Sequence, residues 1–356
     1  MTPSANIDLE KLLNAVAARG ASDLHLSVGR YPTLRIDGKL VPLTEEKRVT
    51  PERNEAIVDF LLSEKQRTLL DKYKDIDLSY DFKGKARFRV NIFQQKGYFG
   101  LAFRFIPVKI RTIEELKLPL VLKDFTRLNQ GFVLIVGPSG HGKSTTMAAL
   151  VDLINHTRTE HIITIEDPIE YIFTPDKCII DQRELHKDAV SFPRALRAAL
   201  REDPNVVVVG EMRDLETIET AITVAETGHL VFATLHTNDA SQTVDRIVDV
   251  FPSHQQPQIR TQLAAILLGI VSQRLLPRVD GGRVVACEVL LATPAVRNLI
   301  REGKTHQLAS VIQTSAKEGM VPLNKSLAEL VKSGEVKLED ALLYSLDPRE
   351  LKSLLK

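Results

Sequence analysis

The chain has no tryptophan and only two cysteines, Cys178 and Cys287, among its 356 residues. The two cysteines are far apart in apolar segments and show no metal-ligand spacing, so we expect reduced core residues of a cytosolic protein. A strong charge of one sign is missing too, because Lys and Arg (47) nearly balance Asp and Glu (46). The balance leaves no global basic field that would hold nucleic acid or an anionic membrane.

Long hydrophobic runs are also absent from the sequence. The longest near-continuous apolar run, at 263–271, is far shorter than the roughly 20 residues that span a bilayer, so we expect no transmembrane segment. The first ten residues carry no basic stretch followed by an apolar core, so no secretion signal is predicted. With 44% apolar residues, the chain can still form ordinary globular cores in two or three domains.

The most informative stretch that is present lies at 137–145, between an apolar run at 132–136 and a segment with helical periodicity. Its spacing fits a phosphate-binding loop, in which glycines let backbone N–H groups surround phosphate oxygens at the positive end of a helix. Lys143 is predicted to reach the β and γ phosphates, and Ser144 to bind Mg²⁺. The alternative is a chance match in a glycine-containing turn, which the strand before and the helix after disfavour. The predicted nucleotide-binding residues are Gly137, Pro138, Ser139, Gly140, His141, Gly142, Lys143, Ser144 and Thr145.

The pattern before and after this loop predicts two domains. Residues 1–106 combine amphipathic helical spacing with short alternating strands, which indicates a separate α+β domain. Residues 107–115 are a plausible linker. Over 116–356 strands and helices alternate, which is typical of an α/β domain with a parallel sheet, and a helical C-terminal region is expected from about 293 to 356. The expected helices of this domain include 239–250 and 255–276.

Three arginines of the first domain are predicted to share one face of an antiparallel meander with strands at 76–80, 86–93 and 98–105. A turn at 94–97 would place Arg89 opposite Ala102 and Arg104 opposite Arg87. Two interpretations remain. The face is the solvated side of a half-buried sheet, or the like charges gather around an anion such as the phosphates of a neighbouring subunit's nucleotide.

Acidic residues follow two of the predicted parallel strands. Glu166 follows the strand at 161–165, and Glu211 comes shortly after the strand at 206–209. Because ligands bind beyond the carboxyl ends of such strands, these side chains are expected beside the phosphate loop. P-loop enzymes usually end the second strand with an aspartate near Mg²⁺, but Gly210 occupies that position here, so Glu211 or Glu166 must replace it.

Two histidines, His229 and His236, enclose another apolar strand. They are seven positions apart, an odd number, so on one strand they face opposite sides and do not ligate one metal. His236, at the carboxyl end, is placed to sense the γ phosphate. For His229 a hydrogen-bonded interior histidine is an equally good interpretation.

Taken together, these segments resemble the secretion-superfamily ATPases, and within them the motors that retract type IV pili. The similarity covers nearly the whole chain and is carried by segments 137–144, 164–170, 209–214, 227–237, 21–26 and 295–302. Val296 stands where the last segment normally has isoleucine, and His141 where relatives commonly have a small residue. No four-cysteine cluster is present, which argues against the extension and secretion motors that carry a zinc-binding insertion.

The resemblance implies a PAS-like N-terminal α+β domain followed by a RecA-like P-loop ATPase domain. It also implies a homohexamer that uses ATP and Mg²⁺ to drive pilus retraction, and so pilus disassembly and twitching motility. Such a motor works in the cytoplasm, peripherally at the inner membrane at the pilus base, on a PilC-like platform protein. Residues 295–302 would be needed for retraction rather than for hydrolysis as such.

Individual roles follow from the same resemblance. Glu166 would polarise the attacking water, and Glu211 would hold the metal shell. His229 and His236 would couple the nucleotide state to the subunit interface. Arg89 and Arg104 match arginines of the family that reach a neighbouring subunit's nucleotide.

Two other functions are compatible with a P-loop. A nucleic-acid translocase would need a basic channel with aromatic side chains, and the balanced charge and missing tryptophan weigh against it. A non-catalytic nucleotide-dependent scaffold is disfavoured by the acidic residues at both strand ends. Measurements of ATP turnover and of its stimulation by DNA distinguish the three.

Overall fold

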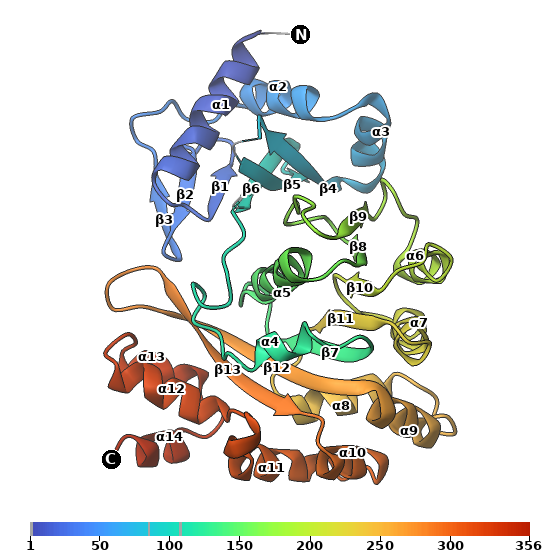
Figure 1. Ribbon diagram of the computed structural model, residues 1–356. Coiled ribbons are helices and arrows are strands. Elements are labelled where there is room, and N and C mark those ends of the chain that lie inside the picture. The colour runs from blue at the N-terminus through green and yellow to red at the C-terminus, as the bar shows by residue number, and fades with distance from the viewer. Residues whose placement is uncertain (1–2, 85, 107–108) are drawn as a thin grey trace. The chain divides into compact units, whose positions relative to one another are not determined.

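The computed structural model describes residues 3–84, 86–106 and 109–356 (Figure 1). By its internal contacts the chain divides into two compact units, residues 1–109 with 170–172, and residues 110–169 with 173–356. The predicted linker at 107–115 begins at residues 107 and 108, which lie outside the described residues. The domain bounds given above stay predictions.

The first unit is built on an antiparallel sheet with the strand order β3-β2-β1-β6-β5-β4. Its described helices are α1 (Pro3–Ala18), α2 (Pro51–Leu61) and α3 (Glu64–Tyr73). Its described strands are β1 (Asp23–Leu26), β2 (Thr33–Ile36), β3 (Lys39–Pro42), β4 (Asp75–Phe82), β5 (Ala86–Gln95) and β6 (Tyr98–Ile106).

The helices of this unit pack on one face of its sheet, because their apolar residues recur at helical spacing. Leu9, Leu12 and Leu13 of α1 are fully or almost fully buried in the same core cluster as the inward side chains of the strands. Helical spacing at 51–73 produces two helices rather than one, because Ser63 starts α3 with a capping box.

The hairpin between β5 and β6 turns more tightly than the sequence predicted. The turn consists of Lys96 and Gly97 alone, both with positive φ (49° and 82°), so that Gln95 pairs directly with Tyr98. Two successive residues with positive φ match the right-handed twist of the flanking strands, which is why two-residue hairpins favour this conformation. Lys96 at the first turn position gave little indication of this turn conformation, because asparagine and aspartate are the usual residues at that position.

As a result, the predicted pairing of the arginines was wrong. Arg89 faces Arg104 directly, and Arg87 faces Ile106, instead of the pairs of Arg89 with Ala102 and of Arg104 with Arg87. The register differs by two residues, an even number, so the side chains keep their faces. The expectation that the three arginines share one face is therefore confirmed; together they are called the arginine face.

The second unit contains a mostly parallel sheet with the strand order β13-β12-β7-β11-β10-β8-β9, in which β13 alone runs antiparallel among the described strands. The strands are β7 (Gly131–Val136), β8 (His161–Glu166), β9 (Ile179–Glu184), β10 (Val206–Val209), β11 (Leu230–Leu235), β12 (Leu267–Pro277) and β13 (Arg283–Leu291). The first helices are α4 (Leu122–Phe125), α5 (Lys143–Thr157), α6 (Phe192–Ala199), α7 (Leu215–Glu226), α8 (Ala240–Asp249) and α9 (Gln256–Ile266). Because helices cover the sheet, every residue of β7, β10 and β11 is buried.

The C-terminal region is helical, as predicted, and packs beside β12 and β13 (orange to red in Figure 1). It contains α10 (Pro294–Arg301), α11 (Leu308–Thr314), α12 (Leu323–Lys332), α13 (Leu338–Tyr344) and α14 (Pro348–Leu354). Short 3₁₀ turns at Thr305–Gln307 and Ala316–Glu318 lie between them. The predicted fold class, an α+β domain followed by a P-loop domain with a parallel sheet and a helical tail, is confirmed.

The predicted helix over 255–276 was wrong beyond Ile266. Helix α9 ends there, and the chain passes directly into β12, which lies between β7 and β13. Because neighbouring elements cover both faces of this strand, its sequence is nearly continuous in apolar residues and lacks the alternation that indicates a strand. Gly269 fits the strand position, because a Cβ there would lie 2.5 Å from the Phe125 ring and 2.8 Å from the Leu290 carbonyl oxygen.

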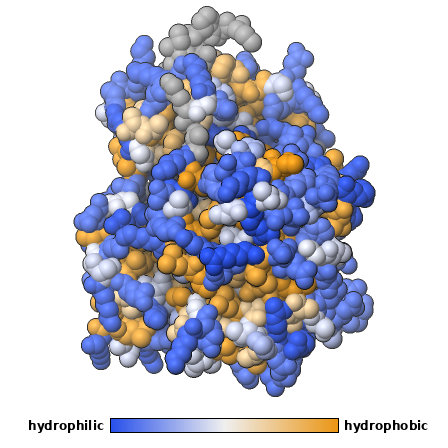
Figure 2. Space-filling view, in the orientation of Figure 1, coloured by the Kyte–Doolittle hydropathy of each residue, from blue (hydrophilic) through white to orange (hydrophobic). Residues whose placement is uncertain are grey.

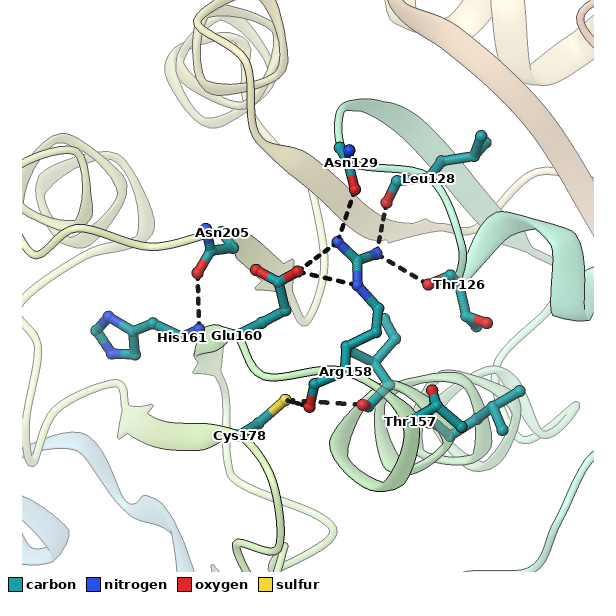
Figure 3. A network of polar contacts seen from close by, with 11 residues as sticks. Thr126, Leu128, Asn129, Thr157, Arg158, Glu160, His161, Cys178 and Asn205 are labelled. Carbon is teal, nitrogen blue, oxygen red and sulfur yellow. Dashed lines mark hydrogen bonds and ion pairs between the residues drawn. The ribbon is translucent and has the colours of Figure 1, made fainter.

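The amino ends of the parallel strands are joined by Arg158 (Figure 3). Its guanidinium donates to the carbonyl oxygens of Thr126 (2.9 Å) and Leu128 (2.6 Å), to Asn129 Oδ1 (3.0 Å) and to Glu160 Oε1 (2.7 Å). These bonds connect the end of α5 to the loop before β7. The network stabilises the edge of the sheet opposite the phosphate loop.

Both cysteines are unpaired and buried, as expected of core residues. Burial raises the pKa of the Cys287 thiol to about 12, which keeps it protonated. No helix within 3–84, 86–106 and 109–356 has the length and apolar character to cross a membrane. The face in Figure 2 is mainly hydrophilic, with hydrophobic residues between the polar ones.

Candidate nucleotide-binding site

The phosphate loop joins β7 to α5, and three of its glycines adopt backbone conformations that side chains disfavour. Gly137, Gly140 and Gly142 have φ values of 144°, 79° and 84°. At Gly137 a Cβ would also lie 2.6 Å from the carbonyl oxygen of Gln273 on β12. The glycines therefore allow a compact loop whose backbone can approach phosphate oxygens closely.

Lys143 is held inside this loop. It is 8% exposed, and its Nζ donates to the carbonyl oxygens of Gly137 (2.9 Å) and Pro138 (3.0 Å). A buried ammonium needs such partners, since desolvation of an unpaired charge is costly. The same Nζ lies 3.4 Å from Nδ1 of His236. The ammonium thus lies at the carboxyl edge of the sheet, where β7, β8, β10 and β11 end; we call this the nucleotide edge.

Glu211 and His236 meet at the nucleotide edge. His236 Nε2 lies 3.4 Å from Glu211 Oε2, and Arg213 Nη2 contacts Glu211 Oε1 at 2.6 Å. The turn that carries Glu211 is fixed because the Thr234 hydroxyl donates to the Gly210 carbonyl oxygen at 2.6 Å. Together with the lysine, these residues form a continuous polar contact across three strand ends.

Glu166 ends β8 at the same edge. Its Oε1 accepts hydrogen bonds from the Thr164 hydroxyl (2.7 Å) and from Gln182 Nε2 on β9 (3.3 Å). A Cβ on Gly210 would lie 3.2 Å from the Cα of Glu166 and from the Ile165 carbonyl oxygen. The glycine that replaces the usual aspartate therefore lets the ends of β8 and β10 lie close together.

His229 is not brought to this cluster. It precedes β11, while His236 follows it, so the two histidines lie at opposite edges of the sheet. His229 Nδ1 donates to the Val224 carbonyl oxygen at 2.9 Å and lies 3.2 Å from the Thr227 hydroxyl. Within one chain its contacts are those of a hydrogen-bonded, half-buried histidine. Its predicted coupling role stays a prediction.

The arginine face carries carboxylates of its own sheet. Arg104 Nε lies 3.0 Å from Asp23 Oδ1, and Arg89 Nη2 lies 3.4 Å from Asp77 Oδ2. These aspartates offset the repulsion between the two facing arginines. The aspartates therefore account for the clustering of these arginines within a single chain, and the clustering alone is no evidence for a bound anion.

The oxygen donors at the nucleotide edge suit Mg²⁺. A hydroxyl at Ser144 and a carboxylate at Glu211 are hard ligands of the kind that Mg²⁺ prefers, and the ion usually takes its remaining ligands from water and substrate phosphates. In the described part of the chain no group of three or more His, Cys, Asp or Glu residues is placed to hold a metal alone.

Sequence reasoning missed the polar residues of β12 and β13. Arg274 Nη2 and the Ser272 hydroxyl both donate to the Asn238 carbonyl oxygen, at 2.7 and 2.8 Å. Glu288 Oε1 accepts from the Ala240 N–H at 2.9 Å, and burial, the main cause, raises its pKa to about 7. These contacts fix the loop after β11. For Ser272 and Arg274 the only signal was their position as polar residues within 255–276, which the sequence predicts as a helix.

Residues 295–302, expected to matter for retraction, form most of α10. Val296 and Ile300 are buried, and Arg297 donates to the carbonyl oxygens of Ala292 (3.0 Å) and Ala264 (2.6 Å). These contacts cap the end of α9. These three residues of the segment are therefore part of the packing of its own unit.

Comparisons with known proteins agree with this geometry. The family described as type II/IV secretion system protein matches residues 4–343. The type IV pilus retraction ATPase PilT of Pseudomonas aeruginosa is 47% identical over 94% of this chain and 97% of its own. A twitching motility protein of Neisseria gonorrhoeae is 45% identical over 87% of this chain and 83% of its own. The crystal structure of the pilus retraction motor PilT with bound ADP superposes with a TM-score of 0.87 at 48% identity, covering 97% of this chain and 98% of that one.

Proposed function

Because the chain belongs to the type II/IV secretion system protein family, we propose that it is a hexameric motor ATPase that drives type IV pilus retraction, and with it pilus disassembly and twitching motility. The proposal is supported by the similarity, along nearly the whole chain, to a pilus retraction ATPase and to a twitching motility protein. The observation that carries it is the contact between Lys143, His236 and Glu211 at the nucleotide edge.

ATP is the proposed substrate, with its phosphates in the loop at 137–145. Lys143 would exchange its carbonyl partners for phosphate oxygens, which are stronger acceptors for an ammonium. Mg²⁺, when bound, would offset the charge on the phosphates, and Ser144 and Glu211 would supply oxygens to its shell. The bound ADP of the similar PilT structure supports the binding of a nucleotide by this chain.

Glu166 is the proposed residue that orients the attacking water. Its carboxylate accepts from Thr164 and Gln182, so its position is fixed before substrate arrives. His236 contacts both Lys143 and Glu211, which suits a residue that responds to the γ phosphate. His229 is proposed to act at the interface between subunits.

Arg89 and Arg104 are proposed to complete the site of a neighbouring subunit in the ring. Arginines that approach a transferring phosphoryl group stabilise its developing charge. Here both would exchange an aspartate of their own sheet for phosphate, which ties hydrolysis to contact between subunits. Chemistry and movement are then coupled, because a site is complete only when two subunits close.

The proposed setting is the cytoplasmic side of the inner membrane at the pilus base. The motor would act on a PilC-like platform protein and on no nucleic acid. Residues 295–302 would serve retraction rather than hydrolysis.

Two experiments test the proposed function. Deleting the gene should leave excess surface pili that do not retract and should abolish twitching, whereas loss of pili would indicate an extension motor. Purified protein should hydrolyse ATP without stimulation by DNA. Stimulation by DNA would favour a translocase, and absence of turnover would favour a scaffold.

A further inference from the structure

The phosphate loop is attached to the C-terminal helices through His141. This residue lies between two glycines with positive φ, Gly140 and Gly142, and its side chain points out of the loop to two partners. Its Nδ1 accepts a hydrogen bond from the backbone N–H of Leu275 at 3.0 Å. Its ring meets the Tyr344 ring edge to face, with centroids 5.8 Å apart and an interplanar angle of 63°.

This hydrogen bond lies where β12 continues beyond the end of its pairing with β7. Strand β7 pairs with β12 only as far as Val136 and Ser272, whereas β12 continues to Pro277 and pairs there with β13. The N–H of Leu275 therefore lies past the last β7 partner. Leu275 is half-buried, and a backbone donor shielded from water is costly to leave without an acceptor; His141 supplies the acceptor that β7 no longer provides.

The imidazole of His141 is held in its neutral form, which this hydrogen bond requires. Nδ1 can accept only while His141 is neutral, with the proton on Nε2. Burial lowers the pKa of His141, and the positive charges of Arg274 on β12, Lys143 in the loop and Arg283 on β13 lower it further. The loop is thus joined to β12 by a neutral acceptor at physiological pH.

Tyr344 connects this contact to the rest of the C-terminal region. It is the last residue of α13 and packs on the cluster formed by β12, β13 and the helices α12 to α14, with Leu276, Val284 and Ala341 in its core. A change in how α13 packs would therefore move the ring against which His141 rests.

We propose that the pair formed by His141 and Tyr344 couples helix α13 to the phosphate loop, so that the packing of α13 sets nucleotide affinity and nucleotide in turn stabilises α13. The inference rests on the proposed binding of nucleotide by this loop. Tyr344 is a positioning residue, because it acts on the phosphates through His141. The coupling is reciprocal, since the same free energy links two binding or packing events in both directions.

A double-mutant cycle tests the coupling. ADP affinity is measured by titration of a fluorescent ADP analogue for the wild type, His141→Ala, Tyr344→Ala and the double variant. We expect each single change to weaken binding about three- to tenfold, the range of aromatic contacts, and the double variant to be no weaker than the weaker single one. Losses that multiply, or a Tyr344→Ala affinity equal to the wild type, would overturn the coupling.

A matched control lies on the same helix. The Leu343 side chain is 81% exposed, so Leu343→Ala should bind ADP as the wild type does. Amide hydrogen exchange at 338–344 gives the reciprocal readout. We expect ADP to slow exchange there in the wild type and in Leu343→Ala, and to leave it unchanged in His141→Ala. Protection by ADP that persists in His141→Ala would contradict the inference.

A further variant separates the two contacts and avoids dependence on Tyr344→Ala, should that protein fail to fold. His141→Asn keeps an acceptor for Leu275 but removes the ring that touches Tyr344, so we expect it to lose the ADP effect on α13. A wild-type protein that does not bind ADP contradicts the proposed function itself. Binding with equal affinity in all variants contradicts only the coupling.

Discussion

The nucleotide edge and the arginine face hold their charges in different ways. Lys143 is 8% exposed and bonded to backbone carbonyls of its own loop, whereas the Arg104 side chain is 58% exposed and pairs with Asp23. The first region is therefore formed before substrate arrives. Under the proposed function, the second would release its own carboxylates before its arginines contact a phosphate of a neighbouring subunit.

The strongest test of this difference is Arg104→Ala. If the side chain acts across a subunit interface, we expect the turnover number to fall by about 10³ to 10⁵, because arginines in this role contribute that much in other P-loop enzymes. ADP affinity should change little. Steady-state ATPase assays and ADP titration measure the two effects.

The matched control for that variant is Arg35→Ala. Arg35 also approaches Asp23, at 3.8 Å, and lies on the same sheet. Its loss should leave turnover within about twofold, since exposed ion pairs contribute little. Equal losses in both variants would mean that Arg104 acts only through the stability of the sheet.

At the nucleotide edge, Lys143→Ala should lower turnover by about 10²- to 10³-fold, the usual cost of removing one electrostatic contact to the transition state. In contrast to Arg104→Ala, it should also weaken ADP binding, because the lysine belongs to the binding loop itself. Lys317→Ala, an exposed lysine in the same unit, is the control. Normal ADP affinity in Lys143→Ala would contradict the preformed site.

The two regions also differ in their carboxylates. Glu288 is buried near the nucleotide edge, whereas the carboxylates of the arginine face pair with arginines. Its folded pKa is raised to about 7 from 4.5, so the folded protein binds the extra proton between these values. The free energy of unfolding should therefore fall as pH rises from about 4.5 to 7, by up to about 3 kcal/mol at about 1.4 kcal/mol per pH unit.

Glu288→Gln should remove this decline, because an amide does not titrate and still accepts from Ala240. Urea unfolding at pH 5 and pH 8 measures it. The variant should match the wild type at pH 5 and exceed it at pH 8. A wild type as stable as Glu288→Gln at both pH values would show that Glu288 is ionised in the folded protein well below pH 7.

The smallest effect is expected for Asp77→Asn on the arginine face. The contact of Asp77 with Arg89 is 3.4 Å long and partly exposed, so its loss should change the free energy of unfolding by less than about 1 kcal/mol. Thermal unfolding at low salt checks this. A larger loss would mean that the aspartate is needed to hold the two arginines together.

Prediction from the sequence was most accurate for elements that have one buried and one solvent-exposed face. Phe88 and Val90 alternate with Arg87 and Arg89, so the faces of β5 were correct even though the turn was not. The phosphate loop was equally clear, because three glycines at fixed spacing follow an apolar strand. Glu166, Glu211 and His236 were correctly placed at one edge of the sheet by the rule that parallel strands end there.

Among the strands that are buried on both faces, the prediction failed for β12, which follows α9 without a break. Strand β12 shows no alternation, so its apolar run matched a helix as well as a strand, and the polar residues that it carries were not recognised. The contact between His141 and Tyr344 was unpredictable for another reason. The two residues are about two hundred positions apart and are joined only by tertiary packing.

The most direct test of shared sites is to mix two inactive variants. Arg104→Ala subunits keep an intact Lys143, and Lys143→Ala subunits keep an intact Arg104, so mixed rings contain interfaces with both residues. We expect ATP turnover in the mixture well above that of either variant alone. A mixture that forms rings yet hydrolyses no faster than its components would contradict a site completed by the neighbouring subunit.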